Sequence, residues 1–104
     1  MLTLGIDPGT ATIGYGLVSE LHDGSLQAVA FGVITTKAGL PLAERLDIIY
    51  SGITKLVQQH KPDRSAVEEL FFAKNVTTAL SVAHGRGVIL LALNQGGLPV
   101  YEYK

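Results

Sequence analysis

The first ten residues, Met1–Thr10, read MLTLGIDPGT and predict the first element of the fold. Apolar residues up to Ile6 alternate weakly with smaller ones, which is typical of a strand, and Pro8 with Gly9 predicts a turn after Asp7. Proline followed by glycine suits a type II turn, in which the third residue needs a positive φ. We therefore expect a buried strand that holds the Asp7 carboxylate at its tip.

Two more strand segments follow this turn. Thr12–Glu20 is the second strand, and Leu26–Thr36 is the third. The residues between them include His22–Ser25 (HDGS), whose composition predicts a turn. Strands this close together in sequence pair as an antiparallel meander.

Helical spacing begins after Pro41, which suits a first helical turn, and stops at Pro62. The apolar residues between the two prolines recur at steps of three and four and so lie on one face of a helix. This stripe consists of Leu42, Leu46, Ile49, Ile53, Leu56 and Val57. It predicts an amphipathic helix that packs on the sheet.

The rest of the chain alternates between strand and helix. Arg64–Glu68 is predicted as a short buried strand, Asn75 as the N-cap of a helix that reaches about Gln95, and Leu98–Tyr103 as a fifth strand. The order βββαβαβ predicts an α/β fold with a mixed five-stranded sheet, because strand-helix-strand units need parallel neighbours. Residues 1–104 are expected to form one domain that stops directly after its fifth strand.

The composition indicates a globular domain and excludes several classes of protein. Apolar residues make up 47% of the 104 and charged residues 16%, which argues against disorder. Without cysteine there is no disulfide framework, thiolate nucleophile or zinc ribbon. We expect a cytoplasmic protein with no membrane partner, because neither a signal core nor a bilayer-length apolar run is present. The formal charge of −1 lacks the basic excess usual in DNA-binding domains.

Acidic residues end two of the predicted strands. Asp7 ends the first strand, and Glu68 and Glu69 end the fourth. Parallel neighbours lie about 4.8 Å apart, so carboxylates at their ends can share metal ions. Adjacent strand residues point to opposite faces of the sheet, so only one of the two glutamates can lie beside Asp7. The alternation alone does not say which of the two it is. The alternative for Asp7–Thr10 is an ordinary hairpin turn or the phosphate turn of an ATPase.

The ordered set of motifs resembles the N-terminal portion of RuvC-type Holliday junction resolvases. The resemblance rests on Gly5–Thr10, Gly14–Gly16, and Ala66–Glu68 followed by Phe71 and the segment 73–75. It continues through 83–87, 94–95 and 98–103. It implies an RNase H-like fold and a metal-dependent endodeoxyribonuclease that cuts four-way junction DNA in recombination and repair. It also implies a homodimer and a branch-migration helicase partner of the RuvA/RuvB type.

The resemblance assigns roles to individual residues. Asp7 and Glu68 would be catalytic and would bind Mg²⁺, with two ions in a complete site. The residues that would approach DNA are Gly9, Thr10, Phe71, Lys74 and Asn75, and Phe71 would enter the junction near the crossover. Ala79, Ala83 and Gly87 recur at steps of four and would form the dimer interface, although the same ridge could pack on the chain's own sheet.

Members of that family continue past the fifth strand, where a late helix supplies further metal-binding acids. We therefore expect this chain to lack the C-terminal helices and to be inactive by itself. Two other functions stay open from the sequence. One is an actin-like or sugar-kinase ATP-binding half-domain, which would need a second phosphate loop that the sequence does not contain. The other is a non-catalytic module that binds branched DNA or a protein partner.

Overall fold

The computed structural model describes residues 1–9, 11–69 and 76–104. The predicted order βββαβαβ is confirmed, while Asn75, the predicted N-cap, lies outside the described residues. The elements are β1 (Leu2–Asp7), β2 (Thr12–Glu20), β3 (Leu26–Thr35), α1 (Leu42–His60), β4 (Arg64–Glu68), α2 (Val76–Gln95) and β5 (Val100–Tyr103).

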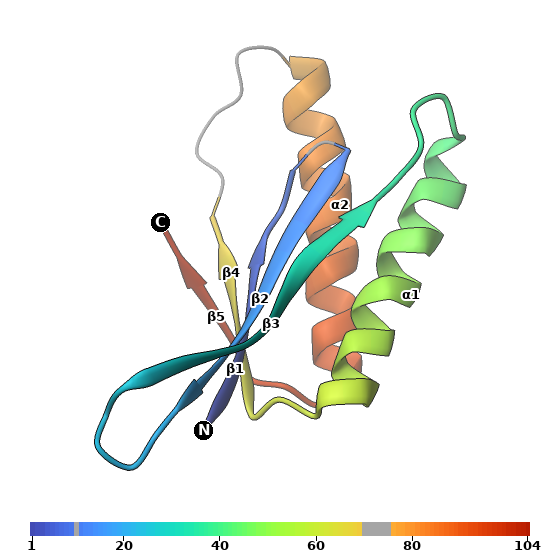
Figure 1. Ribbon diagram of the computed structural model, residues 1–104. Helices are drawn as coiled ribbons and strands as arrows, with labels where there is room; N and C mark the ends of the chain where they lie inside the picture. Colours follow the sequence, from blue (N-terminus) through green and yellow to red (C-terminus); the bar gives the residue numbers. More distant parts are fainter. Residues whose placement is uncertain (10, 70–75) are drawn as a thin grey trace.

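The five strands form one mixed sheet in the order β3-β2-β1-β4-β5 (Figure 1). β2 pairs antiparallel with both β1 and β3, which is the predicted meander. β4 pairs parallel with β1, and β5 pairs parallel with β4, as the two crossovers require. The first strand of the chain is therefore the central strand of the sheet.

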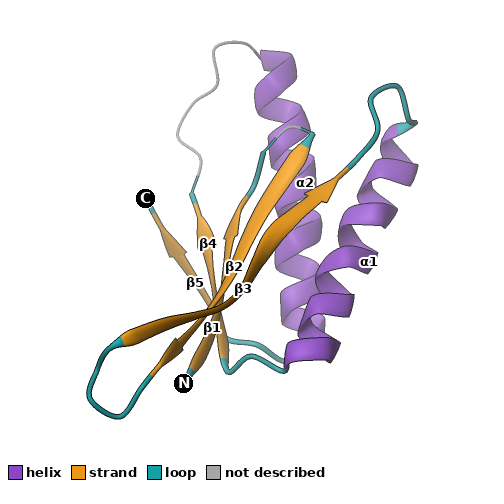
Figure 2. Cartoon of the chain, in the orientation of Figure 1, coloured by secondary structure: helices purple, strands orange, loops and turns teal. Residues whose placement is uncertain are grey.

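Both helices lie on the same side of the sheet (Figure 2). Alternate strand residues point toward them and are buried, because successive side chains of a strand point to opposite faces. The buried core consists of Leu4, Ile6, Ile13, Leu17, Ile49, Ile53, Leu56, Val67, Ile89, Ala92, Leu93 and Leu98. We call the other side of the sheet the open face, since neither helix covers it.

The apolar stripe predicted for α1 faces the sheet over most of its length. Ile49, Ile53 and Leu56 are buried, whereas Leu42, in the first turn, is exposed. The helix ends as expected before Pro62, because Lys61 adopts the left-handed conformation (φ 48°) and donates its N–H to Val57 O. In the part of the chain that the structure describes, neither helix is both long and apolar enough to span a membrane.

The fifth strand is shorter than predicted. It begins at Val100 and not at Leu98, because the backbone of Leu98 is still occupied by the end of α2. The Leu98 N–H donates to Leu93 O at 3.2 Å, after Gly97 has turned the chain with a φ of 80°. A residue that caps a helix in this way cannot pair in the strand ladder.

The turn after β1 differs from the prediction at Gly9. Gly9 does not adopt a positive φ, so the expected type II turn is wrong. Glycine is required there for another reason: a Cβ atom at Gly9 would collide with the carbonyl oxygen of Thr12. The backbone of the turn folds back on itself too closely for any side chain.

We expect Gly9→Ala to destabilise the protein by about 1–3 kcal/mol, the usual cost of forcing an atom into filled space. Gly16→Ala is the matched control, because a Cβ atom at Gly16 meets nothing within 4 Å. Urea unfolding followed by circular dichroism measures both. Equal stability of the two variants would contradict this account of the turn.

Candidate active site

The register between β1 and β4 decides which acidic residues meet. Gly5 pairs with Ala66, and Ile6 pairs with Val67. Ile6 and Val67 are fully buried beneath the helices, so the next residue of each strand must point the other way. Asp7 and Glu68 therefore emerge together on the open face, at the carboxyl ends of adjacent parallel strands.

The two carboxyl groups lie close enough to affect each other's ionisation. The pKa of Glu68 is raised above its ordinary value of 4.5, first because its side chain shares a hydrogen bond with Asp7 and second because Asp7 carries a negative charge. Both causes favour the protonated form of Glu68, because two neighbouring carboxylates repel each other when both are ionised. A cation bound between them would remove that repulsion.

On the open face, the residues next to Asp7 on β1 and β2 are glycines. Gly14 pairs with Asp7 across the β1–β2 ladder, and Gly16 pairs with Gly5. Cβ atoms at these three glycines would meet no heavy atom closer than 3.8 Å, so the fold itself does not require glycine at them. Their absent side chains leave the backbone bare beside Asp7 and give a ligand room to approach.

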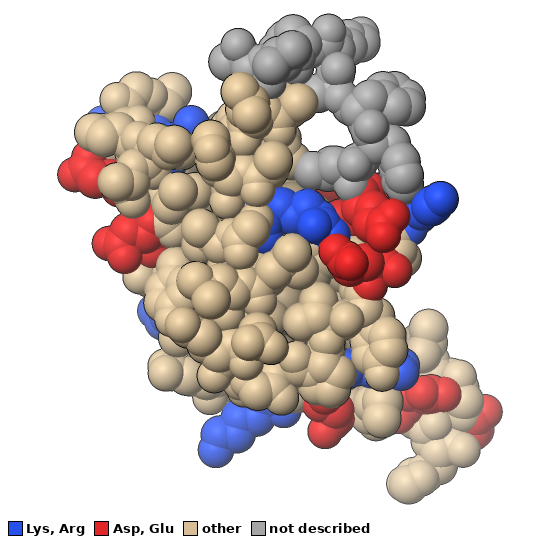
Figure 3. Space-filling view, turned by 180° about the vertical axis from the view of Figure 1, so that it is seen from behind, with Lys and Arg blue, Asp and Glu red and all other residues tan. Residues whose placement is uncertain are grey.

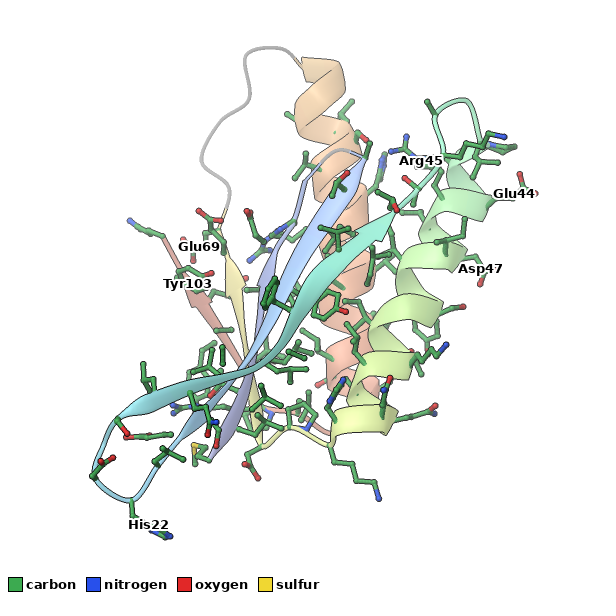
Figure 4. The ribbon with its side chains drawn as sticks, in the orientation of Figure 1. His22, Glu44, Arg45, Asp47, Glu69 and Tyr103 are labelled. Atoms are coloured by element: carbon green, nitrogen blue, oxygen red, sulfur yellow. The ribbon has the colours of Figure 1, made fainter. Side chains whose placement is uncertain are left out.

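Glu69 does not join the pair. It follows Glu68 at the end of β4, and its N–H donates to Tyr103 O on β5 at 2.5 Å. Figure 4 shows Glu69 and Tyr103 near each other at the ends of these two strands. The ambiguity between the two glutamates is thus resolved by the β1–β4 register, which brings Glu68 to Asp7.

An ion pair lies on the helix side of the same region. Arg86 on α2 contacts Glu102 on β5 through its guanidinium group and the carboxylate. Acidic side chains gather over the carboxyl ends of β4 and β5 in the view from behind (Figure 3). Among residues 1–9, 11–69 and 76–104, no three His, Cys, Asp or Glu side chains are grouped as metal ligands. Within these residues, the acidic ligands available to a metal ion are therefore a pair, Asp7 and Glu68, and not a group of three.

The other predicted site residues fall into three groups. Ala79, Ala83 and Gly87 are all exposed on α2, so the alternative that this ridge packs on the chain's own sheet is wrong. The proposed DNA contacts Thr10, Phe71, Lys74 and Asn75 lie outside the described residues. Gly9 is described, and it lies in the turn directly after Asp7.

A model of the family described as crossover junction endodeoxyribonuclease RuvC matches residues 3–104. The chain belongs to the RuvC family. RuvC proteins of Chloroflexus aggregans and Chloroflexus aurantiacus are 57% and 55% identical to it over all 104 residues. The chain spans 63% of the length of each of these curated relatives.

A solved RuvC structure has the same fold. Thermus thermophilus RuvC in complex with a Holliday junction substrate superposes with a TM-score of 0.91 at 30% sequence identity. The match covers 99% of this chain and 65% of the Thermus chain. The RNase H-like fold expected from the sequence motifs is thereby confirmed.

Tyr103 is a residue that the sequence analysis did not single out. It pairs with Glu68 in the β4–β5 register, and its pKa is raised first by burial and then by the charges of Glu68 and Asp7. The hydroxyl therefore lies within electrostatic reach of both carboxyl groups. A signal was present in the sequence, since Tyr103 ends the fifth strand as Asp7 and Glu68 end theirs, but the register could not be read from it.

We expect Glu68→Gln to stabilise the metal-free protein at neutral pH. Because folding raises the pKa of Glu68, its contribution to stability is full below pH 4.5 and is lost as the pH rises through the raised value. The melting temperature of the variant should therefore equal that of the wild type near pH 4 and exceed it increasingly toward pH 7.

Glu69→Gln is the control, because it removes the same charge one residue further along. Differential scanning calorimetry of the three proteins from pH 4 to 8, in the presence of a chelator, measures the effect. A difference between Glu68→Gln and wild type that does not change with pH would contradict the proposed repulsion.

Proposed function

We propose that this chain supplies part of the active site of a Mg²⁺-dependent endonuclease that cuts four-way junction DNA in recombination and repair. The observation that carries the proposal is the contact between Asp7 and Glu68, the two acids that end adjacent parallel strands in a chain of the RuvC family. The Holliday junction bound to the Thermus relative supports the choice of substrate.

The paired carboxylates fit a hard divalent cation. Mg²⁺ prefers oxygen ligands, and Asp7 and Glu68 present such oxygens side by side on a face with glycine neighbours. A divalent metal ion held by Asp7 and Glu68 would supply the Lewis acidity needed for phosphodiester hydrolysis. The part played by this chain is to hold the two carboxylates on rigid, hydrogen-bonded strands, with their oxygens directed away from the core.

The proposed DNA contacts surround the ends of these strands in sequence. Gly9 and Thr10 follow Asp7 directly, and Phe71, Lys74 and Asn75 follow Glu68 within seven positions. A phenylalanine stacked on an unpaired base contributes about 1–3 kcal/mol, and a lysine can neutralise a phosphate. These contacts depend on residues close to the acidic pair, which would explain recognition by a chain with a net charge of −1.

We also propose that the working unit is a homodimer joined through α2. Ala79, Ala83 and Gly87 form an exposed ridge of small residues, which permits a second helix to approach closely. Leu80 and Leu91 on the same helix are 54% and 49% exposed, and at helical steps from Ala83 and Gly87 they extend the ridge into one apolar surface of the kind that marks interfaces. A cytoplasmic location and a branch-migration helicase partner of the RuvA/RuvB type complete the proposal.

We expect Ala83→Arg to shift the chain toward the monomer, because a long charged side chain would keep the two α2 helices apart. Ala43→Arg is the matched control, since Ala43 is exposed on α1 away from the ridge. Sedimentation velocity over a range of protein concentrations measures the association. A dimer that persists in Ala83→Arg would exclude α2 as the interface.

The 104-residue chain by itself is proposed to be inactive. Two carboxylates provide few of the six ligands of an octahedral Mg²⁺ and would hold it weakly.

A chimera tests the function directly: this chain replaces the matching part of the Chloroflexus aggregans relative, which is 57% identical over that part. The chimera should cut a synthetic four-way junction with paired symmetric nicks only when Mg²⁺ is present.

Asp7→Asn and Glu68→Gln in the chimera should each lower cleavage by at least about a thousandfold, because each removes one of the two carboxylates that would hold the metal ion. Glu69→Gln is the control and should retain activity. Binding of the junction should persist in all three variants, as measured by gel shift in Ca²⁺. Cleavage by Asp7→Asn at the unsubstituted rate would exclude this active site.

A further inference from the structure

Three adjacent parallel strands end in polar residues on the open face. Asp7 ends β1, Glu68 ends β4, and Tyr103 ends β5. The β4–β5 register pairs Glu68 with Tyr103, so their side chains leave the sheet on the same side. The hydrogen bond from the Glu69 N–H to Tyr103 O holds the two strand ends together at this position.

Tyr103 brings a hydrogen-bond donor to the strand next to Glu68, on the same face of the sheet. Tyr103 is 45% exposed, so part of the residue is covered and part is open to solvent. Burial and the charges of Glu68 and Asp7 raise the pKa of the Tyr103 phenol above its ordinary value of 10.0. A tyrosine hydroxyl is a hydrogen-bond donor at neutral pH, and the β4–β5 register places Tyr103 next to the Glu68 carboxylate that could accept from it.

We propose that Tyr103 is a positioning residue for the Glu68 carboxylate, to which its hydroxyl donates a hydrogen bond when Glu68 is ionised and bound to a divalent cation. The proposal rests on the function proposed above. A carboxylate at the end of an open strand can rotate, and a donor on the neighbouring strand would fix one of its oxygens. The other oxygen is then held toward Asp7, where the cation would bind.

Partners of this kind have a measurable effect on metal affinity. Carboxylates that bind metals are themselves hydrogen-bonded, and loss of the partner costs about 10–100-fold in affinity or activity. Tyr103→Phe removes the hydroxyl and keeps the ring, so the packing at the end of β5 is retained. Tyr101→Phe is the matched control, because Tyr101 lies on the same face of the same strand but pairs with Ala66.

The test is the affinity of the whole 104-residue chain for Mn²⁺, which substitutes for Mg²⁺ and whose free form is counted by electron paramagnetic resonance. We expect Tyr103→Phe to bind Mn²⁺ about tenfold more weakly than wild type, and Tyr101→Phe to bind it equally well. Asp7→Asn should remove the binding. Circular dichroism and melting temperature confirm that each variant is folded.

The outcomes separate this inference from the function on which it rests. If Asp7→Asn removes binding and Tyr103→Phe leaves it unchanged, the role of Tyr103 is overturned and the acidic site stands. If the wild-type chain binds no Mn²⁺ at millimolar concentrations, or binds it equally after Asp7→Asn, the acidic site fails and the role of Tyr103 fails with it. Equal weakening by Tyr101→Phe would show a general effect of β5 and would also overturn the proposal.

Discussion

The parallel pairing of β1 with β4 is the constraint on which the rest of the site depends. Two hydrogen-bonded strands that run in the same direction bring their carboxyl ends to one edge of the sheet. The pairing of Ile6 with Val67 buries both side chains under the helices and so directs Asp7 and Glu68 to the open face. A shift of one residue in this register would exchange the faces and bring Glu69 in place of Glu68.

The acidic pair illustrates how a stable core supports an unfavourable local arrangement. Two carboxyl groups in contact raise the pKa of Glu68, which means that the folded protein opposes their joint ionisation. The strands that hold them are continuous with the buried core, in which Leu4, Ile6 and Val67 are inaccessible to solvent. The burial of apolar residues one position away keeps the charges together, and this is the arrangement that a cation-binding site requires.

The exposed surfaces of the molecule are also distributed unevenly. The helices cover one face of the sheet, while the open face carries the acidic pair together with Phe31 and Val33 on β3. On the outside of α2, the small-residue ridge is flanked by exposed leucines. The acidic pair and the proposed dimer contact therefore lie on different surfaces, so substitutions can test the two proposals separately.

The sequence by itself determined the order of the elements, the ends of α1 and β4, and the two acidic segments, because these depend on local periodicity, proline and strand-ending residues. It could not decide between Glu68 and Glu69. The alternation of side chains along a strand assigns the two glutamates to opposite faces of the sheet, but it does not say which face the helices cover. The type II turn predicted at Gly9 was also wrong. Glycine is required there because a side chain would collide with the carbonyl oxygen of Thr12, and not because φ is positive. Strand register, the solvent exposure of Ala83 and the position of Tyr103 beside Glu68 were decided only by the tertiary structure, because each is a contact or an exposure that depends on residues distant in the chain.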